Sequence, residues 1–118
     1  GAQVLADSTA ILRHDPTGIE SMWMGGRYIN MQLTAKTQGG RHTWGYAIDF
    51  IEEAGEKGRA HTHYHLSLHH NQGNDPTSYS QTHYCSILTT QLPQYENTDT
   101  ITVSVHTFKG IKSWTFSN

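Results

Sequence analysis

The chain has 118 residues, a net charge of −2 with neutral histidines, and 8 lysines and arginines spread along its length. This length suits one domain that builds its own core, and the lack of a basic cluster disfavours nucleic-acid binding. No stretch approaches the roughly 18 apolar residues of a membrane span, no signal peptide is visible, and the single cysteine excludes an internal disulfide.

The first twenty residues carry little periodic pattern. Gly1-Ala2 looks like the remnant of an expression tag, and the apolar run Thr9–Leu12 is short. Asp15-Pro16-Thr17-Gly18 has the composition of a turn, because proline presets φ and glycine accepts positive φ. We expect residues 1–20 to be a tag remnant and linker with a first short strand, and residues 21–118 to form the folded domain.

Two strands are expected in the second quarter of the chain. Residues 27–37 alternate between apolar and polar, which predicts a strand with one buried face. The apolar face consists of Ile29, Met31, Leu33 and Ala35. After a glycine-rich turn at residues 38–41, His42–Glu53 predicts a central strand that carries much of the aromatic core. Its inward side chains are expected to be Trp44, Tyr46, Ile48 and Phe50. A short helix over Tyr46–Lys57 is the competing prediction, because several acidic residues and Ala54 favour one.

Two further strands flank the longest polar loop. Arg59–His70 alternates with period two, which places Tyr64, Leu66 and Leu68 inward. Its outward residues are His61, His63, His65, Ser67 and His69. The loop is expected at Asn71–Ser80, and the next strand at Gln81–Leu92. Cys85 lies in that strand, so we expect it to be a small buried hydrophobe.

The last nineteen residues predict a hairpin. Ile101, Val103 and Val105 form one face of its first strand, and Lys109-Gly110 is the turn. Trp114 and Phe116 share a face of the second strand, which ends two residues later. Because a terminus normally frays, the aromatic pair predicts that this last strand is held inside a sheet. With seven or eight short strands in all, the chain is predicted to be all-β, an antiparallel β-sandwich or, alternatively, a barrel.

The sharpest chemical motif is the run of histidines at alternate positions, His61, His63 and His65. Side chains at i and i+2 of a strand point the same way, so these imidazoles are candidate metal ligands, with Glu52, Glu53 or Glu56 as an added carboxylate. The alternatives are a wet strand face on which histidine fills ordinary polar positions, and a pH-sensing cluster that gains charge below about pH 6.5. No cofactor is expected under the non-enzymatic interpretation that the chain favours.

Aromatic side chains offer a second way to bind, by stacking on a sugar ring or by anchoring a protein contact. Trp23 is one candidate for such a contact. Trp44 and Trp114 lie in alternating strands and are expected in the core. Tyr79 in the polar loop and Tyr95 in a later turn are expected to be exposed contact residues.

The closing sequence, Thr102–Phe108 followed by Ser113-Trp114-Thr115-Phe116-Ser117, resembles the C-terminal end of adenoviral fibre heads, in particular the compact atadenovirus type. Heads of phage receptor-binding proteins are similar in the same way. The resemblance implies a homotrimeric β-sandwich head on the virion surface, preceded by the end of a fibre shaft. Its function would be to attach the particle to a host cell-surface receptor, either a protein or a glycan, without catalysis.

Such a head would contact its receptor through surface loops. The candidate contact residues are Tyr79, Asn74, Asp75, Tyr95, Glu56 and Lys57. Two other interpretations stay open at this point. One is a carbohydrate-binding β-sandwich that is not part of a virus, and the other is a small metal-dependent β-barrel enzyme that uses the histidine-rich strand.

Overall fold

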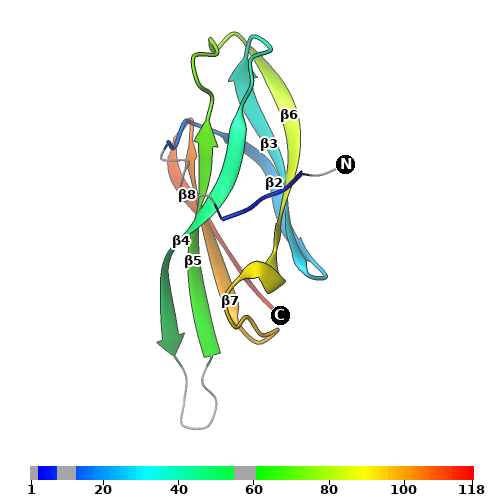
Figure 1. The fold of residues 1–118 in the computed structure, drawn as a ribbon, viewed down its shortest axis with the longest axis vertical. Helices are drawn as coiled ribbons and strands as arrows, with labels where there is room; N and C mark the ends of the chain where they lie inside the picture. Colours follow the sequence, from blue (N-terminus) through cyan, green and yellow to red (C-terminus); the bar gives the residue numbers. More distant parts are fainter. Residues whose placement is uncertain (1–2, 8–12, 55–60) are drawn as a thin grey trace.

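The computed structural model describes residues 3–7, 13–54 and 61–118, which form two four-stranded sheets (Figure 1). The strands are β1 Gln3–Val4, β2 Gly18–Gly25, β3 Tyr28–Thr37, β4 Thr43–Ala54, β5 His61–Asn71, β6 Tyr79–Leu88, β7 Thr100–Thr107 and β8 Gly110–Ser117, with a 3-10 turn η1 at Thr89–Gln91. The predicted β-sandwich is confirmed. None of the described residues belongs to a helix that is long and apolar enough to cross a membrane.

The first sheet has the order β1-β6-β3-β2 and the second the order β4-β5-β7-β8. Neighbouring strands are antiparallel except for two parallel pairs, β1 with β6 and β5 with β7. The β2–β3 turn contains Gly26 at φ 60° and the β7–β8 turn contains Gly110 at φ 104°, which are left-handed conformations that favour glycine. The sheet order brings strands that are distant in sequence side by side.

The core lies between the two sheets and is built from the apolar faces that alternation predicts. The buried side chains of β3, β5 and β7 are Ile29, Met31, Leu33, Ala35, Tyr64, Leu66, Leu68, Ile101, Val103 and Val105. Cys85 is also buried, as expected. Each large apolar side chain of this set stabilises the fold by about 1.5 to 3 kcal/mol relative to its exposed state. Strict period-two alternation is therefore what selects the inner face of these strands.

Strand β4 departs from prediction in two ways. It is an edge strand of its sheet and not a central one, and its register shifts between Ile48 and Phe50. Trp44 and Tyr46 are buried as expected, whereas Phe50 is 55% exposed and lies opposite His65. A bulge places an extra residue on one strand, so the side chains that follow it change faces. The competing helix is excluded for residues 46–54, which are strand.

Strand β8 pairs with β7 along its whole length, as the hairpin predicts, but the prediction that it is held inside a sheet is wrong. It is the edge strand of its sheet, and Trp114 and Phe116 are half-buried against the core. The pairing with β7 and the packed aromatic face together anchor the strand. The alternation of apolar and polar residues indicates which face of a strand is buried, but it does not indicate whether the strand has one neighbour in its sheet or two.

The remaining boundaries differ by a few residues. The polar loop is shorter than expected because β5 ends at Asn71 and β6 begins at Tyr79. The strand predicted up to Leu92 ends at Leu88 and continues as η1. The proposed boundary between residues 20 and 21 lies within β2. The run Thr9–Leu12 and the loop Gly55–Gly58 lie outside the described residues.

Candidate functional site

The outer surface of the second sheet carries the alternating histidines of β5. We call the outward side chains His61, His63, His65, Ser67 and His69 the histidine face. Threonine and serine from β7 and β8 continue this polar surface. Thr102 and Thr115 are joined by a 2.9 Å hydrogen bond between their hydroxyl oxygens, and so are Ser104 and Ser113. The result is a sheet face of imidazoles and hydroxyls, on which Ser67 and His69 are buried.

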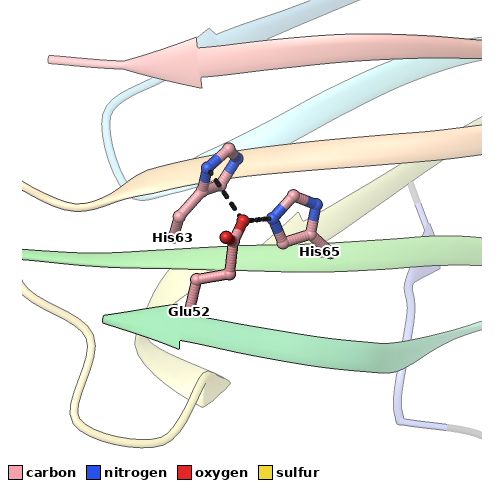
Figure 2. A group of neighbouring side chains, drawn as sticks. All are labelled: Glu52, His63 and His65. Atoms are coloured by element: carbon pink, nitrogen blue, oxygen red, sulfur yellow. Dashed lines mark hydrogen bonds and ion pairs between the residues drawn. The ribbon is translucent and has the colours of Figure 1, made fainter. Parts of the chain in front are cut away.

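Three side chains on this face converge at the β4 edge. Glu52 lies directly opposite His63 in the β4–β5 register, and His65 is two residues further along β5. Figure 2 shows both imidazoles pointing at one carboxylate oxygen of Glu52. The His65 Nε2 atom makes a hydrogen bond with Glu52 Oε1, and His63 Nδ1 lies 3.8 Å from the same oxygen. One potential metal-ligand atom from each of the three side chains lies within 4.8 Å of the other two, so Glu52, His63 and His65 could hold a metal ion.

The structure thus brings together two of the three predicted histidines and one of the predicted carboxylates. His61 lies on the same strand but outside this group. Glu53 pairs with Thr62 and lines a separate surface hollow near Tyr64. Glu56 lies outside the described residues.

Neighbouring side chains fix the orientation of both imidazoles. The Phe50 ring stacks on His65 with centroids 3.9 Å apart, and the His63 ring lies 4.1 Å from that of His65. On its other side His63 Nε2 makes a 2.7 Å hydrogen bond with Thr102 Oγ1. Burial lowers the pKa of His63, the adjacent His65 lowers it further, and the Glu52 carboxylate opposes both effects. The neutral imidazole, which is the form that binds metals, is therefore favoured.

The other end of the histidine face holds a second group of polar side chains. Ser67 donates a 2.8 Å hydrogen bond to the Asp49 carboxylate, and its oxygen lies 3.4 Å from His69 Nε2. His14 packs edge-on against His69 and stacks on His106, with centroids 4.5 Å and 4.4 Å apart. In a Ser-His-Asp triad the histidine bridges the other two residues. Here the serine hydroxyl is bonded to the aspartate, so the order of contacts differs.

A buried histidine network lies between the sheets and the loop after β5. The Asp75 carboxylate accepts a 2.6 Å hydrogen bond from His42 Nε2, and His42 Nδ1 lies 2.7 Å from His70 Nε2. The Trp44 ring stacks on His70 at 3.8 Å. Thr17 Oγ1 lies 3.2 Å from His70 Nδ1 at the inner end. Burial lowers the pKa of His70 to about 4, and the His42 imidazole adds to that decrease.

Of the six predicted contact residues, the four that the structure describes do not form one cluster. Asp75 belongs to the buried network, with a side chain only 3% exposed. Asn74 is exposed in the loop before β6, and Tyr79 is exposed at the start of that strand. Tyr95 follows the opposite end of β6 and packs half-buried against the core, 6.0 Å from the ring of Tyr64. The remaining two, Glu56 and Lys57, lie outside the described residues.

The outer surface of the first sheet carries aromatic side chains, one of which sequence reasoning missed. We call Val4, Trp23, Asn30, Gln32 and Tyr84 the aromatic face; the register pairs Trp23 with Asn30 and Tyr84 with Gln32. Trp23 and Tyr84 are 48% and 54% exposed. Alternation with buried Cys85 was the signal that could have placed Tyr84 outward.

The amides of the aromatic face are held in place by neighbours. Gln32 Nε2 donates a 2.6 Å hydrogen bond to Glu20, and the Asn30 side-chain oxygen accepts a 2.9 Å hydrogen bond from Ser86. These bonds orient polar groups between two half-exposed aromatic rings. Such a mixture of rigid aromatic area and fixed polar groups is typical of a binding surface.

The family model described as "NigD-like C-terminal beta sandwich domain" matches residues 3–118. A solved structure of a putative toxin-related protein from Parabacteroides distasonis is similar, with a TM-score of 0.72 and 17% identity, over 98% of this chain and 60% of that one. A NigD-like immunity protein from Bacteroides caccae has a TM-score of 0.61 and 20% identity, over 98% and 58%. A DUF1344 protein of unknown function from Bacteroides vulgatus has a TM-score of 0.70 and 14% identity, over 99% and 56%.

The chain spans about three fifths of the length of these solved proteins. At such identities the likeness establishes the fold. The search of curated proteins found no significant match.

The predicted relation to adenoviral or phage heads is wrong, because the family match covers residues 3–118 and the similar structures are bacterial. The predictions of a virion fibre head, of attachment to a host cell and of a virion surface location are wrong for the same reason. The closing residues that carried the resemblance are an alternating hairpin, a pattern that unrelated β-sandwiches share. The homotrimer was predicted from this resemblance, which no longer supports it, and it stays a prediction.

Proposed function

The chain belongs to the NigD-like C-terminal beta sandwich domain family, and from this premise we propose that it is the partner-binding domain of a bacterial immunity-type protein. The partner in this proposal is a protein toxin, and the domain acts by binding and without catalysis. One similar solved protein is called a NigD-like immunity protein and another a putative toxin-related protein, which supports this role. Known toxin–immunity pairs include some of the tightest noncovalent complexes.

The observation that carries the proposal is the aromatic face. Trp23 and Tyr84 each leave about half of a large ring exposed on a regular sheet, where the backbone holds them in place. Tryptophan and tyrosine are enriched among the residues that dominate binding energy at protein interfaces. The amides of Asn30 and Gln32 between them are oriented by hydrogen bonds and have little freedom to lose on binding.

Action without catalysis is supported by the order of contacts on the histidine face. The Ser67 hydroxyl donates to Asp49, so it is not activated by a histidine that the aspartate orients.

The experiment begins with the genes that neighbour the one for this chain in its genome. Each neighbour is expressed alone and together with the full-length protein, and growth is followed. We expect one product to arrest growth and the full-length protein to restore it. The affinity of that product for the protein is then measured by calorimetry.

The decisive variant is Trp23→Thr combined with Tyr84→Thr, because threonine retains β-propensity. We expect it to weaken binding by about 30-fold or more, which corresponds to about 2 kcal/mol. The matched control is Ile111→Thr, which removes a side chain that is 64% exposed on the other sheet. Absence of any protected neighbour would refute the immunity role, and unchanged affinity of the double variant would refute the assignment of the aromatic face.

A further inference from the structure

We propose that Glu52, His63 and His65 form a binding site for a divalent zinc ion on the histidine face. The ligand atoms would be Glu52 Oε1, His63 Nδ1 and His65 Nε2, which already lie within 4.8 Å of one another. Two imidazole nitrogens and one carboxylate oxygen are a donor set that zinc accepts in proteins. The site lies on the sheet opposite the aromatic face and does not rest on the proposed function.

The sheet itself sets the spacing of the three donors. Glu52 on β4 is the register partner of His63 on β5, and the period of the strand places His65 on the same face two residues later. The bulge between Ile48 and Phe50 is what turns Glu52 toward this outer face. Sites built on strands hold their ligands more accurately than sites on loops.

The surroundings of His63 identify its ligand atom independently. Its Nε2 atom is engaged by Thr102 Oγ1 at 2.7 Å, and that hydroxyl is bonded in turn to Thr115. This leaves Nδ1 as the free nitrogen, and Nδ1 is the atom that faces Glu52 at 3.8 Å. In metal sites the second nitrogen of a histidine ligand is usually hydrogen-bonded, which fixes the tautomer and the ring orientation. Thr102 occupies that position here.

The exposure of the site determines its coordination. The side chains of Glu52, His63 and His65 are 53%, 28% and 21% exposed, so the open side of the group faces solvent. Three protein ligands leave one position of a tetrahedral zinc ion for water. The Phe50 ring stacked on His65 covers the group from one flank.

The test is titration of the full chain with zinc chloride at neutral pH by isothermal calorimetry. We expect one equivalent to bind, and Glu52→Gln, His63→Gln and His65→Gln each to abolish or strongly weaken that binding. Thr102→Val is expected to weaken it by about 10- to 100-fold, the usual effect of losing a partner that orients a ligand. Far-UV circular dichroism in the presence of a chelator verifies that each variant is folded.

The matched control is His61→Gln, which removes a histidine from the same strand and the same face but from outside the group. We expect it to bind zinc like the unaltered chain. Proton NMR adds a second measure, since the imidazole signals of His63 and His65 should shift on addition of zinc while those of His14 and His106 should not. Absence of binding by the unaltered chain would overturn the proposal. Equal losses in His61→Gln and His65→Gln would also overturn it, because they would indicate diffuse chelation by a histidine-rich strand.

Discussion

Replacement of His70 by glutamine should flatten the dependence of stability on pH between neutrality and about pH 4. His70 is 1% exposed, and the Trp44 ring lies flat against it. Its Nε2 atom faces His42 Nδ1 at 2.7 Å, a gap that holds a single hydrogen. Adding a proton to His70 places a positive charge in a buried site, and the Asp15 carbonyl oxygen 3.1 Å from its Nδ1 atom offsets only part of that cost. Burial accordingly lowers the pKa of His70 to about 4.

The magnitude follows from this shift. In the unfolded chain a histidine binds its proton near pH 6.5, whereas folded His70 stays neutral until about pH 4. Between these values only the unfolded state takes up the proton, so stability falls as the pH falls through this window. About 2.5 pH units at about 1.36 kcal/mol per unit give roughly 3 kcal/mol. The hydrogen bond from the Thr37 hydroxyl lowers the pKa of Asp75 too, but the resulting stabilisation is constant above the unfolded value of about 3.9 and is lost only as the pH falls near and below it.

The assay is urea unfolding followed by circular dichroism at several pH values from 7.5 to 4, for the unaltered chain and for His70→Gln. The readout is the slope of the free energy of unfolding against pH, compared between the two proteins. This slope is independent of any constant loss of stability in the variant. Thr17→Val is the control, because it removes a hydroxyl next to His70 but leaves the imidazole in place. Identical slopes for His70→Gln and the unaltered chain would refute the reasoning.

Two further predictions concern single positions, one in an exposed turn and one in the core. Gly40→Ala should lower the free energy of unfolding by about 1 to 3 kcal/mol, because an added Cβ would lie 2.6 Å from Cγ of Asp75, whose carboxylate is held by hydrogen bonds. The control is Gln38→Ala in the same turn. Equal stability of the two variants in urea unfolding would contradict this prediction. Cys85 should resist alkylation by iodoacetamide in the native state, because burial raises the pKa of its thiol to about 11, and fast labelling without urea would disprove this protection.

The strands with strict alternation were predictable from sequence. In β3, β5 and β7 each apolar residue of the pattern is buried, because a strand with one packed face has no other way to place them. Strand β4 follows the same rule up to Ile48 and then departs from it. The bulge moves Phe50 to the outer face, and no glycine or proline within residues 48–50 predicts it.

The candidate site was predictable only in part. Period two placed His63 and His65 on one face, as the sequence indicates. The choice of Glu52 over Glu53 depends on the register between β4 and β5, and the exclusion of His61 depends on how far Glu52 reaches. The buried network joins His42 to Asp75, which is 33 residues away. Pairings of that kind come from tertiary packing, for which the local pattern carries no signal.

The parallel pairing of β1 with β6 has a consequence for biosynthesis. Gln3 and Val4 pair in the sheet only with Cys85 and Ser86, which lie 82 residues later (85 − 3 and 86 − 4). At about 5 to 20 residues per second, the ribosome needs roughly 4 to 16 seconds to supply that partner. Until then β1 has no partner strand in its sheet, and its backbone hydrogen-bonding groups are open to chaperones.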